Sequence, residues 1–138
     1  MNAALVRLVW QRAAHCCEYC QMPQSLTSLP HEIDHIRSKK HHGRSVLSNL
    51  CLACANCNAF KGSDVAAYDP ASGKLTELFN PRLDAWADHF AWRGPRLFGK
   101  TARGRATVAL LRINLSSRLE HRRMLVTAGV FLPKENRG

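Results

Sequence analysis

Two strings, His31-Glu-Ile-Asp-His-Ile36 and Cys54-Ala-Asn-Cys-Asn-Ala-Phe-Lys61, decide how this chain folds. The first string places a carboxylate beside an imidazole, and the second places an amide and a lysine after two thiols. A third string upstream, Cys17-Glu-Tyr-Cys20, repeats the Cys-x-x-Cys spacing. Two such pairs are typical of a structural site in which four thiolates bind one zinc ion. The predicted zinc ligands are Cys17, Cys20, Cys54 and Cys57.

Other assignments of the cysteines compete with this one. Cys51-Leu-Ala-Cys54 has the same spacing, but a strand would hold Cys51 extended, whereas a turn brings two sulfurs together. A redox-active dithiol is a further alternative, and it would need only one pair. With the preferred zinc site, Cys16 and Cys51 are expected to be small buried side chains.

Composition favours one domain with a polyanionic partner. The chain has 138 residues, of which 46% are hydrophobic, and 20 Lys and Arg against 10 Asp and Glu give a net charge of +10. Nucleic acid is the favoured partner, and an anionic membrane surface is the weaker candidate. No apolar run is long enough to span a bilayer, and the N-terminus lacks the features of a signal peptide. We therefore expect a reducing cytoplasm, where cysteines bind metal more often than they form disulfides.

Hydrophobic periodicity predicts a strand–strand–helix arrangement in the first half of the chain. A helix is expected over residues 3–14, where apolar side chains recur at helical spacing. Strands near 31–36 and over 49–53 would pair as a hairpin closed by the basic loop 37–48. A short helix over 56–61 follows, and Gly62 is placed to end it.

The second half carries less chemistry. Turns are expected at 69–73 and 94–95, a strand over 75–79, and helices over 83–90, 106–113 and 117–128, the last ending at Gly129. Residues 93–123 hold nine Lys and Arg and one acid, Glu120. These arginines form either a phosphate-binding face or a merely solvated one, and the sequence favours neither.

One motif match is misleading. His31-Glu-x-x-His35 fits the zinc-protease pattern, which requires a helix to bring both histidines to one metal ion. Pro30 opens the segment and Ile33 is β-branched, so a strand is favoured. In a strand the two histidines would lie roughly 13 Å apart, at about 3.3 Å per residue, and could not share an ion. We therefore reject the protease interpretation.

The remaining polar residues suit phosphodiester hydrolysis. His35 can act as a general base because an imidazole with a pKa of about 6.5 is mostly neutral at pH 7. Asp34 and Asn58 offer oxygen ligands of the kind that Mg²⁺ prefers. Asp34 and His35 point to opposite sides of an ideal strand. Both can serve one site only if His35 lies at the end of the strand, facing the helix that carries Asn58.

Residues 17–62 resemble the HNH endonucleases of the ββα-metal, or His-Me finger, group, and specifically their zinc-knuckle bacterial type. Three motifs carry the resemblance: Asp34-His35, Asn49 within Asn-Leu-x-Leu-x-Cys, and Cys54-x-x-Cys57-Asn58-x-x-Lys61. It implies an α+β fold with a ββα-metal core and a four-cysteine zinc site. The expected organisation is a single domain over 1–138, with an N-terminal helix (1–15), the core (16–62) and a mostly helical C-terminal extension (63–138).

The resemblance also implies roles for individual residues. His35 is the expected general base, Asp34 and Asn58 are the expected ligands of a catalytic Mg²⁺ or Mn²⁺, and Asn49 is expected to fix the loop that orients His35. The two Cys-x-x-Cys pairs would hold the structural zinc. The residues expected to contact flanking phosphates are Arg37, Lys39, Lys40 and Lys61.

These assignments predict a metal-dependent endonuclease that acts on double-stranded DNA and leaves 5′-phosphate and 3′-hydroxyl ends. RNA is left open as a substrate, and no membrane contact or small-molecule cofactor is expected. The alternative is a non-catalytic, zinc-stabilised module that binds nucleic acid. That module would share the charge and the thiol pairs but would have no use for Asp34, His35 and Asn58 together.

Overall fold

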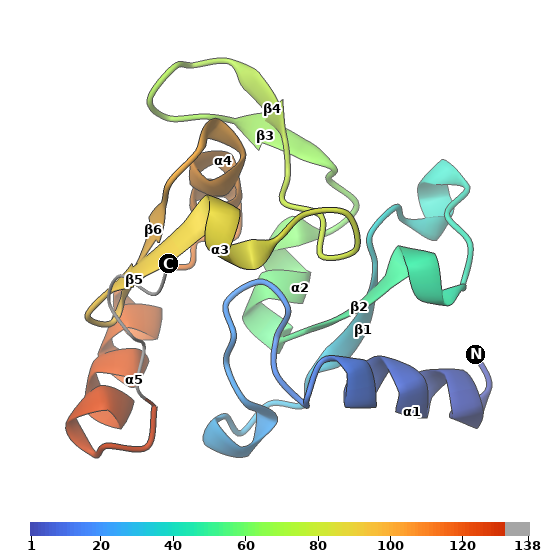
Figure 1. Ribbon diagram of the computed structural model, residues 1–138, viewed down its shortest axis with the longest axis horizontal. Coiled ribbons are helices and arrows are strands. Elements are labelled where there is room, and N and C mark those ends of the chain that lie inside the picture. The colour runs from blue at the N-terminus through green and yellow to red at the C-terminus, as the bar shows by residue number, and fades with distance from the viewer. Residues whose placement is uncertain (132–138) are drawn as a thin grey trace. The chain divides into compact units, whose positions relative to one another are not determined.

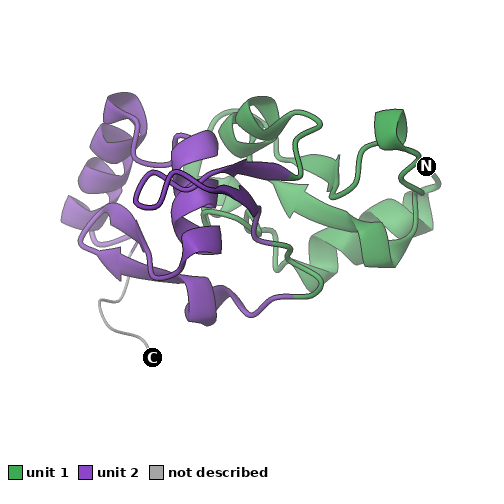
Figure 2. Cartoon of the chain, turned by 90° about the horizontal axis from the view of Figure 1, so that it is seen from above, with its two compact units in different colours: residues 1–65, 80–83 green, residues 66–79, 84–138 purple. Residues whose placement is uncertain are grey.

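The computed structural model describes residues 1–131, in which short helices combine with small antiparallel sheets (Figure 1). The α+β class predicted from the sequence is therefore confirmed. The last part of the predicted C-terminal extension, residues 132–138, lies outside the described residues. The chain divides into two compact units (Figure 2): unit 1 is residues 1–65 with 80–83, and unit 2 is residues 66–79 with the described residues from 84 onward.

Unit 1 is built on a β-hairpin. Strand β1 (Glu32–His35) pairs antiparallel with β2 (Leu50–Ala53), so that Glu32 lies opposite Ala53 and His35 opposite Leu50. Helix α2 (Ala55–Lys61) follows β2 directly, and Gly62 ends it with a φ of +52°. The predicted order of strand, strand and helix is thus present. Between the strands lie the 3₁₀ turns η2 (Lys39–His41) and η3 (Leu47–Asn49).

The two faces of this hairpin are covered by different elements. Helix α1 (Ala3–Arg12) packs Val9 against Leu50 and Leu52, with Ile33 beside them. The alternate residues of the hairpin, which include Asp34 and Cys51, face the other way, toward α2 and the first thiol pair. Because side chains alternate along a strand, neighbouring residues of β1 serve different faces.

Helix α1 ends before its predicted last residue. The helix stops at Arg12, and Ala14 and His15 then adopt positive φ angles of 52° and 59°. This left-handed turn directs the chain away from the helix axis and into Cys17-Glu-Tyr-Cys20. The 3₁₀ turn η1 (Gln24–Leu26) follows in the predicted loop.

Unit 2 contains two further hairpins and three helices. The elements are β3 (Ala66–Tyr68), β4 (Leu75–Glu77), α3 (Trp86–His89), β5 (Phe90–Arg93), β6 (Arg96–Gly99), α4 (Ala102–Leu110) and α5 (Ser116–Thr127). The strand predicted over 75–79 and the helices predicted over 106–113 and 117–128 are present with shifted boundaries. None of the helices within residues 1–131 combines the length and hydrophobicity needed for a membrane span.

The helix predicted over 83–90 is largely wrong. Only Trp86–His89 is helical, and Phe90 begins a strand whose hairpin turns at the predicted Gly94-Pro95. Phe90 and Trp92 are buried while the residues between and after them are more open, so period-two burial overrides the helical pattern. Phe90 packs against Phe79 and Trp86, with ring centroids 5.1 and 5.2 Å apart.

Several arginines of unit 2 are internal, which neither predicted alternative allowed for. Arg122 is 1% exposed and donates to the carbonyls of Pro95 and Ile113, both at 2.7 Å. Arg118, also buried, donates to Leu111 O at 2.7 Å. A guanidinium has five donors in a planar fork, so it can satisfy several carbonyls that no helix or strand uses.

Asp69 joins the β3–β4 turn to α4. Its carboxylate accepts from Arg105 Nε and Nη2 at 2.9 and 3.0 Å, and from Ala71 N and Ser72 Oγ at 3.0 and 2.8 Å. The Arg105 hydrogen bonds, joined by those from Ala71 and Ser72 and opposed by burial, hold the pKa of Asp69 well below its usual value.

Asp69→Asn should therefore destabilise the protein in a pH-dependent way. A carboxylate whose pKa is lower in the folded state stabilises that state above its unfolded pKa of about 3.9, and the effect is lost as the pH falls through the folded value. Denaturant unfolding at neutral pH should show a lower midpoint for the variant. The gap between wild type and variant should close as the pH falls below about 4. A gap that stays constant down to the acid limit would contradict the assignment.

Candidate active site

Four cysteines meet in one buried cluster. The sulfur atoms of Cys17, Cys20, Cys54 and Cys57 all lie within 4.8 Å of one another, and Cys20 Sγ is 3.7 Å from Cys54 Sγ. The two pairs have the same local geometry, because Cys17 Sγ accepts from Cys20 N and Cys54 Sγ accepts from Cys57 N, each at 3.4 Å. The predicted cluster is confirmed, and it could hold a metal ion; its four-thiolate donor set is typical of structural zinc.

The other two cysteines lie outside this cluster. Cys51 is fully buried on β2, as predicted, with its thiol against Tyr19 and Asp34. Burial, and next the charge of Asp34, raise the pKa of Cys51 far above its usual value. Cys16 is only partly buried, contrary to prediction, because it follows the left-handed turn at Ala14 and His15. None of the six cysteines, all of which are described, is in a disulfide.

The two residues between Cys17 and Cys20 connect the cluster to the hairpin. Glu18 N donates to Leu52 O, and the Glu18 carboxylate accepts from Leu52 N, both at 2.8 Å. The same carboxylate forms an ion pair with Arg82. Tyr19 is wholly buried and donates from its hydroxyl to Asp34 Oδ2 at 3.0 Å. Neither residue was assigned a role from the sequence, although both lie inside the motif that defines the thiol pair.

Asp34 and Lys61 form a buried ion pair between β1 and α2. Lys61 Nζ lies 3.2 Å from Asp34 Oδ2, and the two side chains are 2% and 5% exposed. Lys61 Nζ also donates to the carbonyls of His35 and Ile36, each at 3.3 Å. The predicted phosphate contact by Lys61 therefore does not fit this structure, because the ammonium group is enclosed by protein acceptors.

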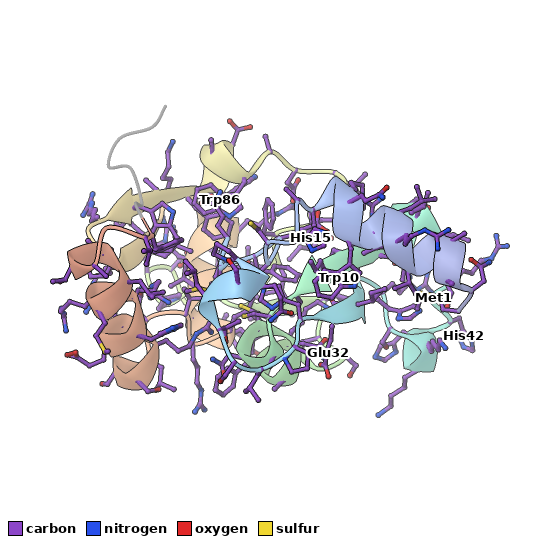
Figure 3. All side chains as sticks on the ribbon, turned by 90° about the horizontal axis from the view of Figure 1, so that it is seen from below. Met1, Trp10, His15, Glu32, His42 and Trp86 are labelled. Atoms are coloured by element: carbon purple, nitrogen blue, oxygen red, sulfur yellow. The ribbon has the colours of Figure 1, made fainter. Side chains whose placement is uncertain are left out.

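Asn58 contacts a different carboxylate. Its side-chain amide donates to Glu32, which lies two residues before Asp34 on the same face of β1. Glu32, labelled in Figure 3, is exposed to solvent. Lys61, one helical turn after Asn58, contacts Asp34. Helix α2 thus runs alongside β1, with Asn58 near the start of the strand and Lys61 near its end.

His35 is the last residue of β1, as expected, and it lies opposite Leu50, whereas Asp34 lies opposite Cys51 on the alternate face. The expected orientation of His35 toward the helix that carries Asn58 stays a prediction. The Nε2 atom of His35 lies 2.8 Å from Ser45 Oγ, a partner that the sequence analysis missed. Burial, and next the positive charge of Lys39, lower the pKa of His35, while Asp34 opposes the shift. The predicted trio therefore lies on β1 and α2, but each member has its own partner: Ser45 for His35, Lys61 for Asp34 and Glu32 for Asn58.

Asn49 joins the two ends of the loop 37–44, which leads directly into Ser45. Its Oδ1 accepts from Arg37 N, and its Nδ2 donates to the carbonyls of Arg37 and Arg44, all at 2.9 Å. Gly43 packs so tightly here that a Cβ atom would lie 1.7 Å from Arg37 O. The amide of Asn49 and the missing side chain of Gly43 together fix the loop that holds Ser45.

The basic side chains of this loop point outward. Arg37, Lys39 and Lys40 are exposed, so the phosphate contacts expected of them stay a prediction, and Arg37 Nε donates to His41 O at 2.7 Å. His42 also lies at the surface, as Figure 3 shows.

The protease interpretation is excluded, as predicted. Residues 32–35 form a strand, so His31 and His35 do not share a helical face. His31 is buried, and its Nε2 lies 2.7 Å from Met22 O. Its ring also stacks on that of Trp10, which is labelled in Figure 3, with the centroids 6.1 Å apart. His31 is therefore part of the packing of unit 1.

The hairpin, its helix and the thiol cluster together have the arrangement of a ββα-metal fold. Residues 17–64 match the family described as HNH endonuclease. The chain is also 30% identical over 112 residues to the Septu protein PtuB of Bacillus thuringiensis. That alignment covers 80% of this chain and 41% of the relative, so the chain spans less than half of the relative's length. No solved structure matches the chain.

Gly43→Ala should open the loop. The added methyl group would collide with Arg37 O and lie 2.9 Å from Asn49 Nδ2, so the backbone must move. Overpacking of this kind costs about 1–3 kcal/mol, and we expect a loss of that size in denaturant unfolding. Lys40→Ala, at an exposed position of the same loop, should leave the unfolding midpoint unchanged. Equal midpoints for both variants would contradict the tight packing described for Gly43.

Proposed function

We propose that this protein is a metal-dependent endonuclease that hydrolyses phosphodiester bonds in DNA. The observation that carries the proposal is the placement of His35 at the end of β1, with Nε2 on Ser45, inside a region that matches the HNH endonucleases. The net charge of +10 supports a polyanionic substrate. A non-catalytic binding module would gain nothing from an imidazole fixed in this way.

His35 is the proposed general base. The contact between Nε2 and Ser45 Oγ holds the ring in one orientation, and in the proposed mechanism Nε2–H donates to the Ser45 hydroxyl. Nδ1 makes no hydrogen bond to protein in the described part of the chain, so it can accept a proton from a water molecule. The resulting hydroxide would attack phosphorus in line with the leaving 3′ oxygen, which gives 5′-phosphate and 3′-hydroxyl ends.

Asp34 and Asn58 are the proposed ligands of a catalytic Mg²⁺ or Mn²⁺. A carboxylate and an amide oxygen fit a hard divalent ion, which would neutralise charge on the scissile phosphate and the leaving oxygen. Asp34 is occupied by Lys61 and Tyr19, so ligation through Asp34 requires Lys61 Nζ to release it. Glu32 on β1 is exposed and already contacts Asn58 of α2. Its carboxylate could bind an ion without displacing Lys61.

The four-thiolate cluster is proposed to hold structural zinc. Its donor set and its burial fit a closed tetrahedral site, with no position left open for a substrate. The redox-dithiol alternative would use one cysteine pair, whereas here both pairs converge. Zinc would hold the turn at residues 17–20 against α2, and through Glu18 and Tyr19 it would support the hairpin.

Arg37, Lys39 and Lys40 are proposed to contact the phosphates that flank the cleaved bond. They are exposed on the loop beside Ser45 and would contact the backbone without reading bases, so binding should weaken steeply with salt. Double-stranded DNA is the proposed substrate, with RNA as the alternative to be compared, and the cytoplasm is the proposed location.

His35→Ala should reduce cleavage of plasmid DNA in Mg²⁺ or Mn²⁺ by about 10²- to 10⁴-fold, the usual contribution of a general base. Ser45→Ala should produce a smaller loss, seen in kcat rather than KM, because the ring is retained but no longer oriented. The metal content and the folding of both variants should match wild type.

His121→Ala, in α5, is the matched control and should cleave normally. Parallel assays on duplex DNA, single-stranded DNA and RNA would identify the substrate. Unchanged cleavage by His35→Ala would overturn the proposed base, and bound nucleic acid without cleavage by wild type would favour the non-catalytic module.

The zinc assignment predicts one zinc ion per chain in metal analysis of the purified protein. Cys57→Ser should lose that zinc and unfold at a lower temperature, since structural zinc contributes directly to folding. Cys16→Ser, which removes a thiol outside the cluster, should keep both the zinc content and the unfolding temperature. Reactive thiols without bound zinc in the wild-type protein would support the redox alternative instead.

A further inference from the structure

The cations of residues 93–123 divide into two groups. Five of the nine are held inside unit 2 or by carboxylates. Arg118 and Arg122 donate to buried carbonyls, and Arg103, Arg105 and Arg123 pair with Asp84, Asp69 and Glu120. Three of the others, Arg93, Arg96 and Lys100, form no ion pair within residues 1–131. All three lie on or directly after the β5–β6 hairpin.

These three cations occupy one face of that hairpin. Phe90, Trp92, Leu97 and Gly99 are buried on the inner face, whereas Arg96, Phe98 and Lys100 alternate with them and are exposed. Arg93 is paired directly opposite Arg96 across the turn. We call the exposed set, Arg93, Arg96, Phe98 and Lys100, the basic ribbon. No Asp or Glu occurs between residues 89 and 119, so the sequence around the ribbon supplies no negative charge.

The ribbon is held from its inner side. Arg122 Nε donates to Pro95 O at the turn, at 2.7 Å. Asn114 Oδ1 accepts from Leu97 N at 2.9 Å, and Asn114 Nδ2 donates to Leu97 O at 2.8 Å. A Cβ atom on Gly99 would lie 2.5 Å from Arg105 N, so β6 packs directly against α4. The outward side chains therefore project from a fixed backbone, which reduces the entropy lost on binding.

The exposed cations of the basic ribbon keep hydrogen-bond donors that a phosphate group could use. The Arg93 guanidinium stacks on Phe98, with Cζ 3.7 Å from the ring centroid, and its edges stay available for hydrogen bonds. Lys100 Nζ uses one donor on Ala87 O at 2.8 Å and keeps two more. The Arg96 side chain makes no polar contact within residues 1–131. Adjacent cations without acids favour a partner with closely spaced negative charges.

We propose that the basic ribbon binds the phosphate backbone of the nucleic-acid substrate. It would form a second contact surface, on unit 2, in addition to the loop of Arg37, Lys39 and Lys40. This inference rests on the proposed function, because it takes nucleic acid as the substrate. The contacts are to phosphates, so they add affinity and salt dependence without sequence preference.

The test is the salt dependence of DNA binding by the full chain in the His35→Ala background, which prevents cleavage. Fluorescence anisotropy with a labelled duplex gives the slope of log affinity against log salt concentration. Arg93→Gln and Arg96→Gln should each reduce that slope by about one, the value for one lost phosphate contact, and the double variant by about two. Arg123→Gln is the matched control, since it removes an exposed arginine already paired with Glu120, and it should leave the slope unchanged.

Slopes in Arg93→Gln and Arg96→Gln that equal the slope of Arg123→Gln would overturn the proposal, provided that circular dichroism shows intact folding. The proposal would also be overturned if these variants lost binding to phosphatidylserine vesicles but bound the duplex as wild type does. The binding slopes test the basic ribbon, whereas cleavage tests the proposed function, so the two proposals can fail separately. Reduced slopes without cleavage by the wild type would support the ribbon and reject the enzyme, whereas His35-dependent cleavage with unchanged slopes would do the reverse.

Discussion

The convergence of two thiol pairs on one point is the constraint on which unit 1 depends. Cys17 and Cys20 lie in a turn before the hairpin, and Cys54 and Cys57 lie at the start of α2, so the cluster brings together both ends of the ββα core. A small domain without a large core needs such a link. The residues between the first two cysteines extend this connection to the hairpin. Glu18 accepts a hydrogen bond from Leu52, and Tyr19 donates one to Asp34.

The ion pair of Asp34 and Lys61 is the second link between strand and helix. Both groups are almost fully buried, and Tyr19, Cys51 and two backbone carbonyls surround them. Loss of one partner from such a pair leaves an uncompensated charge and is far more costly than the net value of the pair. Lys61 is therefore a structural residue in this state of the protein, and the helix that carries Asn58 is fixed against β1 by it. Any ligation of an ion by Asp34 must be coupled to a movement of the Lys61 ammonium group.

The sequence predicted those features that depend on residues close together in the chain. The spacing of the cysteines predicted the cluster, and the alternation of Leu50 and Leu52 predicted β2, because few residues determine either. Partners distant in sequence could not be predicted in this way. Neither the Ser45–His35 contact nor the burial of Lys61 follows from residue type or spacing, since both depend on how the loop and α2 close on β1. The arginines show the same limit: Arg122 and Arg96 look alike in sequence, yet one is enclosed and the other exposed.

The side chain of Asn49 has a consequence for the chemistry of its position. It accepts one backbone N–H and donates to two carbonyls, so it needs a hydrogen-bond donor and an acceptor on the same planar group. Aspartate has nearly the same shape but offers acceptors alone, and it would face two carbonyl oxygens with negative charge. Leucine has a similar size and offers neither. Position 49 therefore requires an acceptor and a donor on one side chain of this size. Among residues of the same shape, asparagine alone offers both.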